Sequence, residues 1–182
     1  IRYPSKWTRQ EEVFHLLDTQ TSNNVEVTIA CAVQALNVYY LPDFIQWKLE
    51  QKFKKVNMWP FGAGGISQHF VYWPAHLNVK SLPIDFKAKC RAKYEAWYPW
   101  WEANWELGIP EWHKGKVDYE QWRSAEYGIK RLDGILSFME SEDWSQRLPE
   151  MKEFLGLCDK QRGITFEKTF PEMKGIFDDT KI

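Results

Sequence analysis

Cysteine is scarce in this chain, and its scarcity excludes several kinds of site. The 182 residues include only Cys31, Cys90 and Cys158, which lie far apart. An odd number of distant cysteines gives neither a disulfide framework nor the close spacing of metal ligands. We expect all three to be buried apolar thiols in a protein of a reducing, cytoplasmic setting.

Strong net charge and long hydrophobic runs are also missing. The formal net charge is -1, so no field is present that would attract nucleic acid or an anionic membrane. No apolar run approaches the roughly 20 residues of a membrane span, and no signal peptide is recognised. The sequence therefore indicates neither nucleic acid nor membrane as a partner.

Aromatic residues, by contrast, are abundant. The chain has 11 Trp, 11 Phe and 8 Tyr, which can bury a large apolar surface despite a mean hydropathy of -0.55. Residues 1–83 and 84–182 differ in character. The first part alternates short helices and strands, whereas long helices with an aromatic stripe fill the second.

The organising stretch is Val25–Pro42. Its β-branched and small apolar residues up to Val33 form a nearly continuous run, which favours a strand covered on both faces in a parallel sheet. Thr8 predicts the N-cap of a preceding helix, and Leu41-Pro42 begins a following one. A second strand is expected over Gln68–Pro74. This order predicts an α/β fold with few parallel strands.

Two amide side chains follow the first strand directly. Gln34 and Asn37 lie where the carboxyl end of a parallel strand usually carries a binding site. The structural alternative is that Asn37 turns the backbone and Gln34 satisfies a buried carbonyl. Both interpretations remain open from the residues alone.

Other polar residues give weaker signals. His69 and His76 flank the second strand without ligand partners at suitable spacing, so we expect structural or surface histidines. The loop Pro60–Gly65 lacks the lysine of a phosphate-binding loop. The aromatic stripe Tyr94–Trp105 is typical of core packing, although an exposed stripe would form a groove for a protein or carbohydrate partner.

Several stretches together resemble one family, the radical SAM proteins, in particular the phage and bacterial "twitch domain-containing" type. Val33–Val38 with Leu41-Pro42 is similar to their fifth barrel strand and its turn, and Phe70–Pro74 to their sixth. The end of the chain is the most specific part. It carries Phe138–Ser145, Leu148-Pro149, Asp159–Arg162 and Thr169–Glu172 in the family's order. The resemblance covers nearly the whole chain.

The resemblance implies S-adenosylmethionine and a [4Fe–4S] cluster as cofactors, with reductive cleavage of S-adenosylmethionine to a 5′-deoxyadenosyl radical. By resemblance, Gln34 and Asn37 would face its ribose and adenosine. Tyr72 and Trp73 would flank the adenine or substrate side, and Arg2 is a further candidate. No catalytic acid, base or metal ligand is assigned in this chain.

The departure from the family is large. The cluster-binding Cys-x3-Cys-x2-Cys motif, the early strands and the glycine-rich segment are all absent from residues 1–182. We therefore expect the C-terminal portion of a partial (β/α) barrel followed by a helical region, which is inactive alone. Its expected partners are the missing N-terminal barrel half and an unknown substrate. The alternative is a non-catalytic module that binds protein or carbohydrate through its aromatic helical face.

Overall fold

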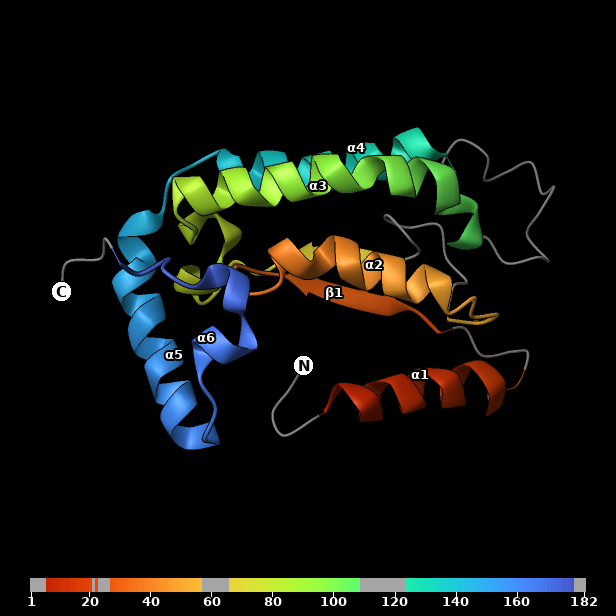
Figure 1. The fold of residues 1–182 in the computed structure, drawn as a ribbon, viewed down its shortest axis with the longest axis horizontal. Helices are drawn as coiled ribbons and strands as arrows, with labels where there is room; N and C mark the ends of the chain where they lie inside the picture. Colours follow the sequence, from red (N-terminus) through yellow and green to blue (C-terminus); the bar gives the residue numbers. More distant parts are fainter. Residues whose placement is uncertain (1–5, 21, 23–26, 57–65, 109–123, 179–182) are drawn as a thin grey trace. The chain divides into compact units, whose positions relative to one another are not determined.

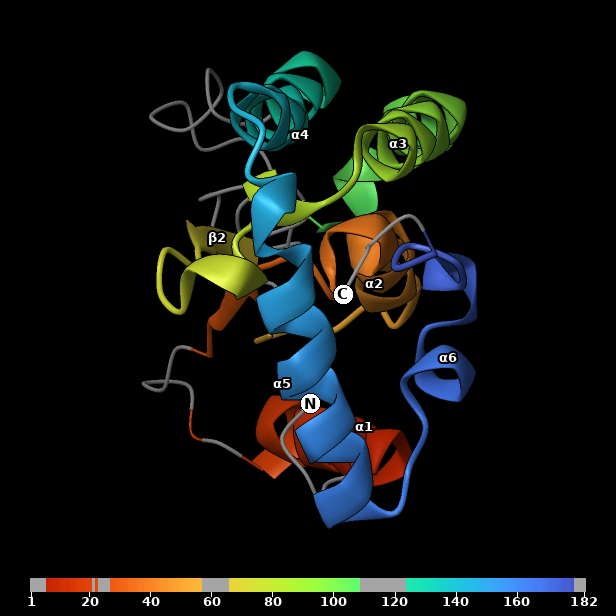
Figure 2. The same cartoon turned by 90° about the vertical axis from the view of Figure 1, so that its left-hand side faces the viewer.

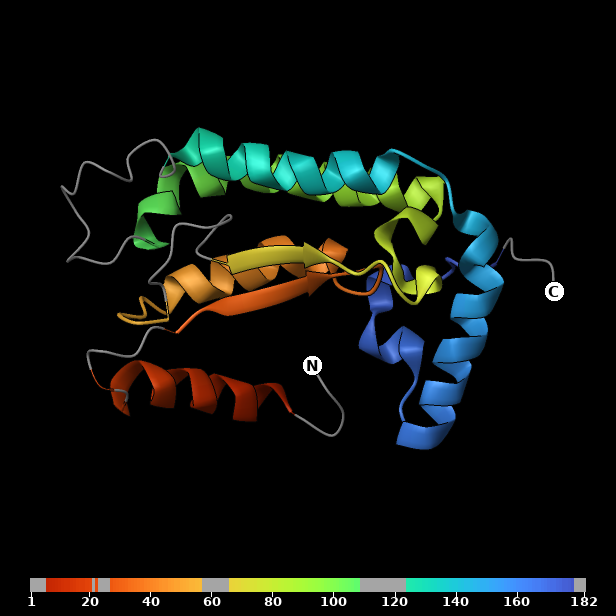
Figure 3. The same cartoon turned by 180° about the vertical axis from the view of Figure 1, so that it is seen from behind.

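The computed structural model describes residues 6–20, 22, 27–56, 66–108 and 124–178 (Figure 1). The chain is a mixed α/β fold that is mostly helical, and β1 and β2 lie side by side as a two-stranded parallel sheet (Figure 3). In chain order the helices and strands of this part of the chain are α1 (Trp7–Gln20), β1 (Ile29–Val33), α2 (Leu41–Glu50), β2 (Ile66–Phe70), α3 (Ile84–Asn104), α4 (Ala125–Glu140), α5 (Leu148–Arg162) and α6 (Phe166–Thr169).

The contacts divide the chain into two compact units, each of which is described by itself. Unit 1 takes its described residues from Ile1–Cys31, Tyr40–His69 and Tyr94–Gly134. Unit 2 takes them from Ala32–Tyr39, Phe70–Lys93 and Ile135–Ile182. The predicted division into residues 1–83 and 84–182 follows sequence order, and it stays a prediction.

Helix α1 begins one residue before the predicted cap. The backbone N–H groups of Arg9 and Gln10 donate to the carbonyl of Lys6, at 3.1 and 3.2 Å. Thr8 therefore lies inside the helix, and its prediction as the N-cap was wrong. The physical reason is tertiary packing, because the first helical residue, Trp7, places its ring 4.7 Å from that of Trp47 on α2.

An aromatic cluster joins α1 to α2 within unit 1. The rings of Phe14 and Trp47 lie 5.7 Å apart, and Phe44 stacks on Trp47 at 5.8 Å. The Trp47 indole N–H donates to the Glu11 carboxylate at 3.1 Å. Pro42 occupies the first turn of α2 as predicted, where its missing N–H leaves no helical hydrogen bond unmade. Both helices are thus fixed side by side.

One face of the small sheet is left open by the residues that the structure describes. Helix α2 lies against the strands on one side in both Figure 1 and Figure 3. Along β1, Val33 is buried, while Ala30 and Ala32 are exposed. The expectation of a strand covered on both faces was therefore wrong. A run of small and β-branched residues permits burial of both faces, but the described chain covers only one.

Strand β2 starts and ends earlier than the predicted Gln68–Pro74. Pairing continues as far as Val71, whose N–H donates to the carbonyl of Val33 at 2.9 Å. The chain then leaves the sheet through Trp73 and Pro74, which are joined by a cis peptide bond. Proline has no N–H to offer to a strand neighbour, which is consistent with an end of pairing before it.

Aromatic packing also connects α3 to α4 in unit 1. Three aromatic side chains of α3 are buried, with exposed fractions of 0% for Tyr94, 8% for Trp97 and 4% for Trp101. The Trp101 indole N–H donates to the carbonyl of Ala125 at 2.8 Å, and the Tyr98 hydroxyl donates to Asp133 at 2.6 Å. Helix α3 continues through Pro99. The stripe is therefore core, as the helical spacing favours.

The C-terminal helices belong to unit 2, where α5 and α6 lie side by side (Figure 2). Helix α5 begins at Leu148 with Pro149 in its first turn and ends at Arg162, and Gly163 caps it with a φ of 62°. Asp159 on α5 accepts a hydrogen bond from the N–H of Phe166 at 2.9 Å, which fixes the start of α6. Over the described ranges, none of the helices has the length and apolar character to cross a membrane.

Candidate functional site

The carboxyl ends of β1 and β2 meet within unit 2. Beyond the strands, the N–H of Ala35 donates to the carbonyl of Leu77 at 2.9 Å. This bond and the one between Val71 and Val33 hold the two outgoing chains together. Gln34 follows one strand, and Tyr72 and Trp73 follow the other. The structure therefore brings these predicted site residues to the same end of the sheet.

Asn37 has a defined structural role in the turn after β1. Its side-chain oxygen accepts from the N–H of Gln34 at 2.9 Å, and its side-chain nitrogen donates to the carbonyl of Ala32 at 2.9 Å. The structural alternative for Asn37, that it turns the backbone, is confirmed. Its amide closes the turn that positions Gln34, whose side chain is half-buried.

Tyr72 and Trp73 present aromatic surface to solvent. Tyr72 is 62% exposed and Trp73 is 84% exposed. The ring of Tyr72 meets that of Phe138 edge-on at 5.7 Å, which fixes one side of it. Both therefore offer ring faces to a ligand. Arg2, the remaining predicted contact, lies outside the described residues.

The two flanking histidines differ in their surroundings. His69 is exposed and shares a hydrogen bond with Ser67 Oγ at 2.8 Å. His76 is largely buried, with its ring 5.1 Å from that of Phe154 and its Nδ1 3.9 Å from the Glu150 carboxylate. His69 is therefore a surface residue, whereas the structural role expected for His76 stays a prediction, because its buried Nε2 atom has no hydrogen-bond partner among the described residues.

A charged cluster beside this site was missed by the sequence reasoning. The buried Lys80 forms an ion pair with Glu142. Its ammonium group also lies 4.4 Å from the centre of the Phe138 ring and 5.3 Å from that of Trp144. Lys87 donates to the carbonyl of Glu142 at 2.9 Å. These contacts fix the loop between α4 and α5.

We expect Glu142→Gln to lower the urea midpoint of unfolding, because it leaves the Lys80 ammonium buried without its counter-charge. The bonds donated by Lys80 and Trp144 lower the pKa of Glu142. Their stabilisation is therefore present above the ordinary glutamate pKa and is lost as the pH falls through the lowered value.

Glu153→Gln, at an exposed position of α5, serves as the matched control. Adding Lys80→Met to Glu142→Gln should recover part of the lost stability. Equal urea midpoints for Glu142→Gln and Glu153→Gln at neutral pH would contradict this role of Glu142.

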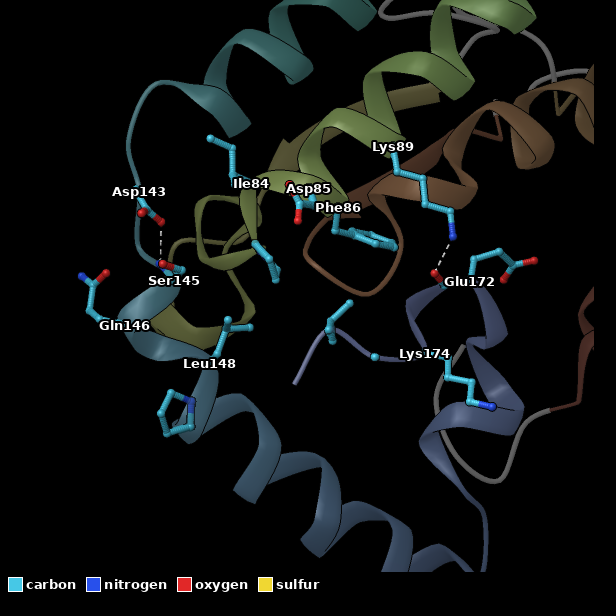
Figure 4. Close-up of a pocket in the computed structure, with 14 residues that line it drawn as sticks. Ile84, Asp85, Phe86, Lys89, Asp143, Ser145, Gln146, Leu148, Glu172 and Lys174 are labelled. Atoms are coloured by element: carbon cyan, nitrogen blue, oxygen red, sulfur yellow. Dashed lines mark hydrogen bonds between the residues drawn. The ribbon is translucent and has the colours of Figure 1, made fainter. Parts of the chain in front are cut away.

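A pocket of about 880 Å³ opens in unit 2 (Figure 4). The first turn of α3, the start of α5 and the segment from Glu172 to Ile176 line it. Asp143, Ser145 and Gln146 lie at one side, and Lys89, Glu172 and Lys174 lie at the other. Such a volume falls within the range of small-molecule and cofactor sites.

The pocket is connected to the carboxyl end of the sheet through Tyr39. This residue follows the turn after β1, and its ring lies 5.6 Å from that of Phe86, which lines the pocket. The ammonium group of Lys89 lies 5.3 Å from the centre of the Tyr39 ring. The carboxyl ends of parallel strands are the usual location of ligand sites in such sheets.

Comparisons of this chain with protein-family models, with curated proteins and with solved structures found no match.

The three cysteines are free thiols. Cys90 and Cys158 are buried as expected, and burial raises the pKa of Cys90 to about 12, whereas Cys31 is only half-buried. Across the described ranges, no three His, Cys, Asp or Glu side chains come close enough together to hold a metal ion.

Proposed function

We propose that this chain is the C-terminal part of a radical SAM enzyme and supplies the last two strands of a partial (β/α) barrel. The observation that supports this best is the order β1, α2, β2, with adjacent parallel strands and α2 on one face of the sheet. In (β/α) barrels the helices form the outer layer, and the other face of the strands lines the interior. In the proposed barrel, the open face of this sheet would line that interior.

The side chains on the open face suit this proposal. Ala30 and Ala32 are small and exposed, and in β2 the exposed His69 lies on the face opposite the buried Ile66. Side chains alternate between the faces of a strand, so Ser67 shares the face of His69. Small and polar groups leave room for further strands and for a ligand. An isolated pair of strands is only marginally stable, which favours completion by a partner.

The proposed partner is the missing N-terminal barrel half, from the same or a separate chain. A two-stranded sheet leaves the outer backbone edge of β1 able to pair with another strand. The free thiols suit the reducing, cytoplasmic setting that we propose for the complete protein.

S-adenosylmethionine fits the exposed residues at the sheet end. Trp73 and Tyr72 present ring faces on which an adenine can stack, and such stacking is worth roughly 1–3 kcal/mol per base. Gln34 would form a hydrogen bond with the ribose. Asn37 would position Gln34 through the hydrogen bonds that hold the turn after β1. Arg2 would be a further contact.

The iron–sulfur cluster does not fit this chain's own residues. Cys31, Cys90 and Cys158 are distant in sequence, and no ligand group forms among the described residues. The cluster ligands would therefore come from the missing half. Bound together, the cluster and S-adenosylmethionine would supply radical chemistry, which this chain would help to orient and shield.

The test uses the complete protein with its N-terminal half, after anaerobic reconstitution of the cluster. We expect reduction to produce 5′-deoxyadenosine from S-adenosylmethionine. Trp73→Ala should raise the KM for S-adenosylmethionine about tenfold, which is the effect of losing one stacking contact.

Leu157→Ala removes another exposed apolar side chain of unit 2 and should leave the KM unchanged. Absence of 5′-deoxyadenosine from the reconstituted protein would overturn the proposed function.

A further inference from the structure

Fixed charges of opposite sign lie at the two sides of the pocket in unit 2. At one side, Asp143 accepts a hydrogen bond from the N–H of Ser145 at 2.9 Å. This bond and that of the Ser145 hydroxyl lower the pKa of Asp143, which therefore remains a carboxylate at neutral pH. The preceding residue, Glu142, is held by Lys80 and Lys87. The position of the carboxylate is thus fixed before any ligand arrives.

The ammonium group of Lys89 is fixed at the other side. It donates to the carbonyl of Glu172 at 2.7 Å and lies 5.7 Å from the centre of the Phe86 ring. Lys174 lies on the same side of the pocket (Figure 4). Ring contacts and one hydrogen bond restrict the long Lys89 side chain, so less conformational entropy is lost when it binds an anion.

Apolar side chains line much of the space between these charges, and Asp85 also lines the pocket there. Phe86 and Leu148 are 5% and 8% exposed and form the buried part of the pocket, while Pro83 and Ile176 extend its apolar lining. A ligand that spans the pocket therefore meets a carboxylate, an apolar surface and an ammonium group in turn. A purely anionic ligand would be opposed by Asp85, Asp143 and Glu172, and a purely cationic one by the two lysines.

We propose that this pocket binds a short peptide with apolar side chains and two free ends, its ammonium group beside Asp143 and its carboxylate beside Lys89. A volume of about 880 Å³ is near the upper end of the range for small-molecule sites, and it accommodates several residues rather than one amino acid. The proposal concerns unit 2 alone and is independent of the radical SAM proposal.

The test is a titration of the full chain with a mixture of tetrapeptides built from Ala, Leu and Phe, followed by NMR. We expect saturable binding and chemical-shift changes at Phe86, Leu148 and Ile176. Converting the peptide carboxylates to amides should weaken binding about fivefold, as should acetylating the amino ends, because each removes one partly exposed charge pair.

Two variants assign the peptide ends to their partners. In Lys89→Met the preference for the acid over the amide form should fall, whereas acetylation should still weaken binding as in the wild type. In Asp143→Asn, acetylation of the amino ends should have little effect, whereas conversion of the carboxylates to amides should still weaken binding. Lys168→Met and Glu153→Gln, at exposed positions of unit 2 outside the pocket lining, should behave as wild type. Absence of saturable binding, or equal effects of end capping in every variant, would overturn the proposal.

Discussion

Replacing Lys48 by Met is expected to raise the free energy of unfolding at neutral pH. Lys48 is fully buried in α2, and burial lowers its pKa to about 7. The unfolded chain therefore binds a proton that the native chain lacks between pH 7 and the ordinary lysine pKa of 10.5. Across this window the titration of Lys48 should contribute a rise in the free energy of unfolding of up to about 1.4 kcal/mol per pH unit.

In Lys48→Met this rise should vanish, because neither state titrates at that position. The variants should differ most near pH 7 and converge as the pH approaches the ordinary lysine pKa. Urea unfolding at several pH values measures the slope, with Lys130→Met at an exposed position of α4 as the matched control. A slope in Lys48→Met equal to that of the wild type would show that Lys48 remains charged in the native state.

Gly128→Ala is expected to destabilise the packing of α3 against α4 within unit 1. A Cβ atom at Gly128 would lie 2.1 Å from Cζ2 and 2.5 Å from Cε2 of the Trp101 ring. The ring is held by its hydrogen bond to Ala125 and is 4% exposed. It therefore has little freedom to move away, and overpacking of this kind costs roughly 1–3 kcal/mol or more.

Gly134→Ala supplies the control on the same helix. No other described atom lies within 4 Å of a Cβ there, so the change should stabilise the helix by roughly 1 kcal/mol through helix propensity alone. Thermal unfolding should thus move in opposite directions for the two variants. Adding Trp101→Leu should relieve part of the strain in Gly128→Ala, whereas equal shifts for both glycines would contradict close packing at Gly128.

Local chemistry made some elements predictable from the sequence. Pro149 marked the first turn of α5, and Gly163 marked its end by adopting the left-handed conformation that favours glycine. The aromatic stripe of α3 was assigned to the core because its spacing follows one helical face. These signals depend on residues within a few positions of one another.

Tertiary contacts decided the features that the sequence reasoning missed. Thr8 is a good cap residue, yet the packing of Trp7 against Trp47 moves the helix start before it. Whether Ala30 and Ala32 are exposed depends on which elements cover the sheet, and an alanine side chain does not indicate this. A run of small residues therefore predicts a strand but not how many of its faces are buried.

The candidate site was predictable to a similar extent. The carboxyl ends of the strands pointed to Gln34, Asn37, Tyr72 and Trp73, and the two outgoing chains do meet. Asn37 had two open interpretations, and only its hydrogen bonds distinguish them. Lys80 and Glu142 pair across 62 positions of sequence. Neither has a local signal for the other, so this pair could not be predicted.

The most direct test of the radical SAM proposal is to sequence the DNA upstream of the codon for Ile1, together with the neighbouring genes. The proposal predicts a Cys-x3-Cys-x2-Cys motif about half a domain upstream, in the same frame or in a companion gene. A start codon just before Ile1 and no companion gene with that motif would contradict it.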